Sequence, residues 1–109
     1  MKNSTNIYRE TEPLVDNAAT ATIALDANAL THQITIETAG VVTTGTATIG
    51  VKAEGASGYT LLRDATDAVL SLDLTAAPYT LRFSGRFTSL QVIPDTYDGS
   101  TYSVTVMGW

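Results

Sequence analysis

The sequence has no cysteine and only one histidine in 109 residues. The missing cysteine excludes structural disulfides, thiolate nucleophiles and cysteine-ligated zinc. His32 is the only imidazole, and the sequence has neither a second histidine nor a G-x-S-x-G motif, so a serine triad is not supported. We therefore predict that the chain is not an enzyme and has no catalytic residues, no metal site and no cofactor.

Basic residues are also few, with six lysines and arginines against eleven acidic residues and a formal net charge of -5. Nucleic-acid binding depends on Lys and Arg contacts to phosphates, so we expect no nucleic-acid partner. No run of about 20 apolar residues exists to span a bilayer, and residues 1–16 lack the apolar core of a secretory signal. These absences predict a soluble product that is made in a cytoplasm and has no membrane partner.

Apolar side chains occupy every second position in short segments from about residue 20 to Trp109. Residues 33–37, 79–84 and 102–106 are the most regular of these segments, and strict alternation is typical of half-buried strands. Turn-forming residues separate the segments at intervals of about 8 to 12 residues. The pattern predicts one all-β domain over residues 17–109, an antiparallel β-sandwich of about eight strands, either jelly-roll-like or immunoglobulin-like. The connectivity of the strands stays open.

Residues 1–16 do not alternate, and the Glu12-Pro13 step disfavours a helical residue before the proline. We interpret this segment as an extended N-terminal arm rather than a strand. A loose tail is one interpretation, since termini are often poorly ordered. An arm that orders on a neighbouring subunit is the other, and it makes Ile7, Tyr8 and Arg9 candidate partner-binding residues.

The aromatic residues divide into two groups by their place in the pattern. Tyr79, Phe83 and Phe87 follow the apolar phase and are predicted to lie in the core. Tyr59, Tyr97 and Trp109 lie at strand ends or at residue 109, where rings can stack on sugars or anchor a protein partner. The second group is therefore a candidate glycan-binding set. Trp109 is also a candidate for partner binding, although it could equally cap the core.

Two pairs of carboxylates invite a chemical interpretation. Asp95 and Asp98 could offer oxygens to calcium, but the loop lacks the D-x-[DN]-x-[DN]-G pattern, and Asp98-Gly99 favours a hairpin turn. Asp64 and Asp67 could resemble the paired carboxyls of a glycosidase. Their place in a predicted exposed turn favours a solvated loop instead.

Residues 79–94 (YTLRFSGRFTSLQVIP) and 99–109 (GSTYSVTVMGW) carry a family resemblance. A ribbon leading to an apolar-x-Pro step, then a short turn and Thr-Tyr-Ser-Val-Thr, resembles the ending of small β-sandwich virion proteins of tailed bacteriophages. The resemblance covers about the last third of the chain. It implies a capsid decoration protein or a head or tail fibre module, located in the virion after synthesis in the host cytoplasm. It also implies contact with other virion proteins such as the major capsid protein, and a homo-oligomer, with a trimer favoured.

The alternative is a carbohydrate-binding or receptor-binding module of a phage fibre that uses Tyr59, Tyr97 or Trp109. Glycan binding predicts aromatic rings grouped with Asp or Asn at one end of the sandwich. Decoration predicts a flat apolar flank or an ordered arm instead. The sequence does not choose between calcium, glycan and protein ligands for these loops.

Overall fold

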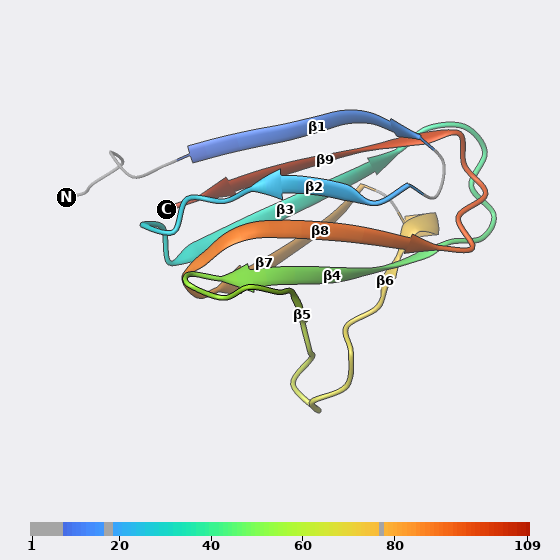
Figure 1. Cartoon of the computed structure of the whole chain (residues 1–109). Helices are drawn as coiled ribbons and strands as arrows, with labels where there is room; N and C mark the ends of the chain where they lie inside the picture. Colours follow the sequence, from blue (N-terminus) through green and yellow to red (C-terminus); the bar gives the residue numbers. More distant parts are fainter. Residues whose placement is uncertain (1–7, 17–18, 77) are drawn as a thin grey trace.

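The computed structural model describes residues 8–16 through their main chain, together with residues 19–76 and 78–109. Nine strands form two antiparallel sheets that pack face to face (Figure 1). The prediction of an all-β antiparallel sandwich is therefore confirmed. Among the described residues, no helix has the length and apolar character needed to cross a membrane.

The two sheets are built from alternating parts of the chain. The first sheet has the order β1-β9-β3-β7, and the second has the order β2-β8-β4-β5, with β6 also paired to β4. The strands of the first sheet are β1 (Tyr8–Asp16), β9 (Thr101–Gly108), β3 (Thr31–Thr38) and β7 (Tyr79–Ser84). Those of the second are β2 (Ala21–Ala24), β8 (Phe87–Asp95), β4 (Thr46–Ala53), β5 (Thr60–Leu61) and β6 (Leu72–Asp73), which precedes the 3-10 turn η2 (Leu74–Ala76).

The connections identify the topology. Apart from the β4-β5-β6 segment, every step along the chain crosses from one sheet to the other. This order of strands is that of a jelly roll, in which two four-stranded sheets enclose one core. The structure thus selects the jelly-roll alternative over the immunoglobulin-like one.

The core lies between the sheets and follows the alternation in the sequence. In β3 and β9 every second residue is buried and its neighbours are half-buried or exposed, because successive side chains point to opposite faces of a sheet. Tyr79, Leu81 and Phe83 of β7 are only partly buried but pack against the core. The buried apolar residues are Ala21, Ile23, Leu25, Ile34, Ile36, Ala47, Ile49, Val51, Leu72, Leu74, Leu90, Val92, Tyr97, Tyr102, Val104 and Val106.

The predicted arm over residues 1–16 needs correction. Over Tyr8–Asp16 the chain forms β1, an edge strand that pairs antiparallel with β9 of the same chain. The register shifts between Glu12 and Val15, so Pro13 falls at an irregularity of an edge strand, where a missing N–H is tolerated. Residues 1–7 lie outside the described part. The strand has no apolar alternation, which is why its sequence predicted an arm.

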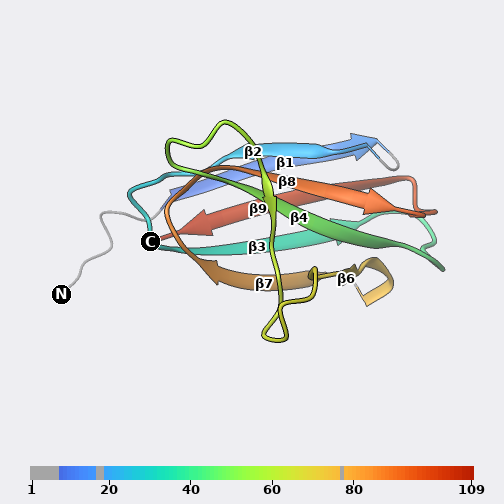
Figure 2. The ribbon, with the colours of Figure 1, turned by 60° about the horizontal axis from the view of Figure 1, so that its bottom comes forward.

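The loop at Asp98-Gly99 differs from its predicted form, whereas the exposed turn predicted at Asp64 and Asp67 is confirmed. Strands β8 and β9 belong to different sheets, so Asp98-Gly99 lies in a loop between the sheets and not in a hairpin turn. The segment from β5 to β6 leaves the second sheet and projects from the sandwich (Figure 1, Figure 2). At its tip the Asp64 carboxylate accepts hydrogen bonds from the N–H groups of Thr66 and Ala68, which makes it a turn-forming residue.

Candidate functional site

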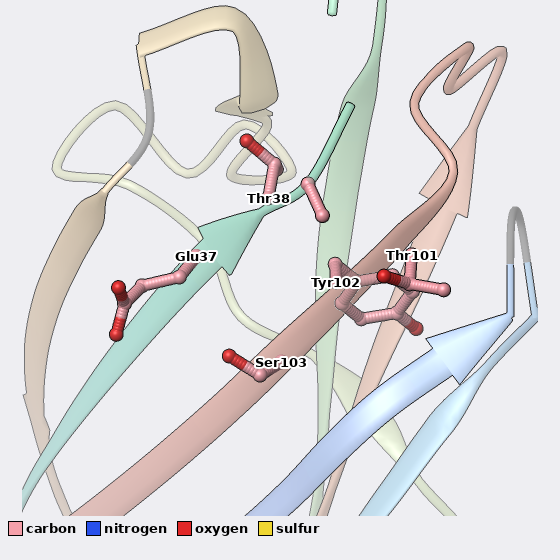
Figure 3. Close-up of a pocket in the computed structure, with 6 residues that line it drawn as sticks. Glu37, Thr38, Thr101, Tyr102 and Ser103 are labelled. Carbon is pink, nitrogen blue, oxygen red and sulfur yellow. The ribbon is translucent and has the colours of Figure 1, made fainter. Parts of the chain in front are cut away.

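One hollow of about 100 Å³ lies where β3 and β9 meet, lined by Glu37, Thr38, Ala39, Thr101, Tyr102 and Ser103. Figure 3 shows Glu37 pointing away from Thr101 and Ser103, so the polar ends do not converge on one point. Ligand pockets usually enclose about 300 to 1,000 Å³. The described residues also contain no cluster of three or more metal-ligating side chains. A functional site is therefore expected on the surface of the domain.

The two ends of the sandwich carry different side chains. At one end, the loops of residues 39–45 and 95–100 meet, and main-chain hydrogen bonds join Ser100 to Ala39 and Asp98 to Thr44. Figure 1 shows these loops at the right of the molecule, opposite the C-terminal residue. We call residues 37–45, 73–76 and 95–100 the acidic end.

The Asp98 carboxylate holds the two loops of the acidic end together. It accepts hydrogen bonds from the main-chain N–H groups of Thr43 and Thr44, at 3.0 and 3.2 Å, and from the Thr43 hydroxyl. The Thr43 hydroxyl and then the Thr44 N–H hold the pKa of Asp98 below its ordinary value, because they stabilise the ionised form. In this structure Asp98 therefore serves as a fixed link between loops.

Tyr97 closes the core at the acidic end, and its predicted exposure was wrong. The residue is only 4% exposed, and its hydroxyl donates a hydrogen bond of 2.6 Å to the Thr101 carbonyl. Its ring meets Tyr102 edge to face at 5.9 Å. Burial raises the pKa of Tyr97. Asp98 fixes the loop so that the preceding ring turns inward, an arrangement that strand alternation does not reveal.

The acidic end exposes four carboxylates, those of Glu37, Asp73, Asp95 and Asp98, and its described residues include no lysine or arginine. Asp73 and Asp95 both pair with Thr46, one on each side of β4, so they lie on the same face of the second sheet. Val41, in the loop of residues 39–45 at the same end, has 82% of its surface exposed. This end therefore combines negative charge with one fully presented apolar side chain.

The opposite end includes the turns at residues 25–31, 52–58 and 82–87, together with Trp109, and we call it the basic end. It carries three cations, Lys52, Arg82 and Arg86, and two carboxylates, Asp26 and Glu54.

The two arginines of the basic end donate to uncharged oxygens. Arg86 donates to the Ala27 carbonyl, and Arg82 donates to the Gln33 amide oxygen while its guanidinium lies 5.0 Å from the centre of the Trp109 ring. Such stacking is a cation–π contact.

His32 closes the core at the basic end. It has no exposed surface, its Nε2–H donates to the Gly85 carbonyl at 2.8 Å, and its ring stacks on Phe83 at 5.2 Å. Phe87 lies against the same cluster. The histidine thus takes part in the packing of the core at this end.

The three candidate glycan-binding rings do not form one group. Tyr97 is buried at the acidic end. Tyr59 is 40% exposed on the outer face of the second sheet, where its hydroxyl hydrogen-bonds Ser89. Trp109 is 39% exposed and lies with Arg82 at the outer face of the first sheet. Tyr59 and Trp109 therefore lie on opposite faces of the sandwich.

The candidate arm residues are also placed differently from the prediction. Ile7 lies outside the described residues. Tyr8 and Arg9 belong to β1, where their main chains pair with Gly108 and Met107 of the same chain. The contact of Tyr8 and Arg9 with a neighbouring subunit stays a prediction, now for residues of an edge strand.

Comparisons with known proteins show no family for this sequence. No family model matches the sequence, and no curated protein matches it either. One solved structure with a similar course is described by the words "Bacillus endospore appendages form a novel family of disulfide-linked pili". It shares 18% identity at a TM-score of 0.43, with 99% of this chain and 96% of that chain covered. Likeness at this level carries no conclusion about the function of the present chain.

Proposed function

We propose that this chain is a non-enzymatic structural protein whose function is contact with other proteins. The observation that carries the proposal is the pair of exposed apolar sites at opposite ends of the sandwich. Val41 is 82% exposed at the acidic end, and Leu30 and Trp109 are 51% and 39% exposed at the basic end. Protein interfaces have an apolar centre and a polar rim.

The proposed setting is a bacteriophage virion, where the chain would decorate or stabilise a capsid after synthesis in the host cytoplasm. The resemblance of residues 79–94 and 99–109 to small virion proteins supports this setting. Repetition over a capsid lattice strengthens weak contacts without new chemistry, so small contact sites suffice. The partners would be the major capsid protein and further copies of this chain, for which the resemblance implies a trimer.

The geometry favours protein contact over the carbohydrate-binding alternative. A glycan site would group aromatic rings with Asp or Asn, whereas Tyr59 and Trp109 lie on opposite faces and Tyr97 is buried. The proposal does not rest on the predicted arm, because its residues Tyr8–Asp16 pair with β9 of the same chain. The contact sites are therefore sought at the two ends of the sandwich.

The test is co-sedimentation of the purified chain with shells of the major capsid protein from the same genome. We expect binding that saturates at a fixed ratio and weakens in the variants Val41→Ser or Leu30→Ser. Val69→Ser is the matched control, because Val69 is 38% exposed but lies on the projecting segment between β5 and β6. A chain that stays in the supernatant, or a genome without a major capsid protein, would contradict the virion setting.

A further inference from the structure

The charges and the exposed apolar residues divide between the same two ends. The acidic end presents four carboxylates and, among its described residues, no cation. The basic end presents Lys52, Arg82 and Arg86 with Asp26 and Glu54. Asp26 already accepts a hydrogen bond from the Asn28 N–H. The two ends therefore differ in the sign of the charge that they offer to a partner.

Each of the two ends also has exposed apolar residues. Val41 stands out from the loop of residues 39–45 at the acidic end. At the basic end the Leu30 N–H donates to the Trp109 carbonyl, so the main chains of these two exposed residues lie side by side. Each end thus has an apolar site next to charges, and the charges of the two ends attract.

We infer that copies of this chain associate end to end, with the acidic end of one copy against the basic end of the next. The contact would pair Val41 with Leu30 and Trp109, while Asp95 faces Arg86. This inference rests on the proposed function, namely that the chain acts through protein contacts. It adds which surfaces of two copies meet.

A second copy is the partner that fits because both members of the complementary pair belong to the same chain. The domain measures 42 Å in its longest direction against 27 and 24 Å in the others, and the two ends lie at opposite ends of the strands (Figure 1). Contact between two acidic ends would place like charges together, which disfavours a twofold dimer through that end. A contact between unlike ends repeats from copy to copy, and it gives a closed ring or an open row according to the rotation between neighbouring copies.

The arginines of the basic end are available for this contact. Arg86 and Arg82 are exposed and donate only to uncharged oxygens among the described residues. A carboxylate of the next copy would provide a charge-assisted hydrogen bond, which is stronger than a neutral one. Exposed charge pairs contribute modestly to affinity, so we assign the alignment of the copies to the charges and the strength of the contact to Val41, Leu30 and Trp109.

The experiment measures the mass of the full chain by sedimentation velocity over a concentration series, from about 20 mM to about 500 mM salt. We expect the mean mass to rise with concentration beyond a dimer, and the association to weaken as salt rises. Val41→Ser and Leu30→Ser should each raise the dissociation constant about tenfold or more. Val69→Ser should leave it unchanged, and urea midpoints should show that all three variants are folded.

A charge exchange tests which surfaces meet. Asp95→Arg and Arg86→Glu should each weaken association, and the double variant should restore it, because the new pair has the opposite order of charges. A mixture of the two single variants should also associate, since it retains one native contact.

A chain that stays monomeric at low salt, or forms a closed trimer unaffected by Val41→Ser, would overturn the inference. Binding of such a monomer to capsid shells would leave the proposed function in place.

Discussion

At the acidic end the core is closed by Tyr97, whose hydroxyl donates to a main-chain carbonyl, whereas at the basic end it is closed by His32, whose ring stacks on Phe83. In both places a ring with a polar atom covers the last apolar layer, and that atom has a main-chain partner. The acidic end depends on a side-chain link, Asp98, to hold its loops. The basic end depends on the shape of one tight turn at Gly85. The comparison shows that loops and turns, more than strands, determine how a small sandwich ends.

The largest expected loss of stability follows removal of the Tyr97 ring, which closes the core at the acidic end. Tyr97→Ala should lower the free energy of unfolding by about 3 to 5 kcal/mol, because it leaves a cavity beside Tyr102. Urea denaturation followed by tryptophan fluorescence measures the change. A shift in the midpoint no larger than that of an exposed residue such as Val69→Ala would show that the ring does not close the core.

The corresponding substitution at the basic end is at Gly85, in the tight turn between β7 and β8. Gly85 has a φ of 140°, and a Cβ there would lie 2.5 Å from Phe87. We expect Gly85→Ala to cost about 1 to 3 kcal/mol, from backbone strain and displacement of the ring. Gly55→Ala is the matched control, since Gly55 has a φ of 84° but no atoms within 4 Å of the added Cβ. It should cost about 1 kcal/mol, and equal costs for both variants would argue against the contact with Phe87.

A smaller loss of stability is expected when the Tyr97 hydroxyl is removed and its ring is kept. Tyr97→Phe keeps the edge-to-face contact with Tyr102 but removes the 2.6 Å hydrogen bond to Thr101. We expect a loss of about 1 kcal/mol, the usual net value of such a bond. The same denaturation measurement tests it. A loss as large as that of Tyr97→Ala would mean that the hydroxyl, and not the ring, holds the loop.

The smallest effect concerns acid stability. Because the folded pKa of Asp98 is lowered, its contribution is present above the unfolded value, about 3.9, and is lost as pH falls through the folded pKa. Asp98→Asn should therefore flatten the dependence of the urea midpoint on pH below about pH 4. Asp95→Asn is the control, since it removes a charge from the same end without removing main-chain hydrogen bonds. An identical response in both variants would contradict the role of the Thr43 and Thr44 bonds.

The sequence predicts the inner strands well because burial leaves a direct mark on them. Residues 33–37 and 102–106 alternate, since one face of each strand meets the other sheet. Strand β1 leaves no such mark. It lies at a sheet edge, and its partner β9 is more than 80 residues away along the chain. Alternation therefore detects strands with a buried face and misses an edge strand that is defined by its pairing.

The candidate site was predicted less well, for a related reason. The positions of Tyr59 and Trp109 on opposite faces depend on which sheet each strand joins, and local sequence does not contain that information. The burial of Tyr97 depends on Asp98 reaching Thr43, a contact across more than 50 residues. The charges of the two ends are visible in the sequence, but only the strand order brings them together.

Strand β9 lies between β1 and β3 and comes last among the strands in the chain. During synthesis on the ribosome, the first sheet therefore lacks one of its two inner strands until residues 101–108 have emerged. Until then β1 has no sheet partner and β3 has only β7. Pairing between strands so distant in sequence is intrinsically slow to form. A nascent chain would thus expose unpaired edges of β1 and β3 until β9 has emerged.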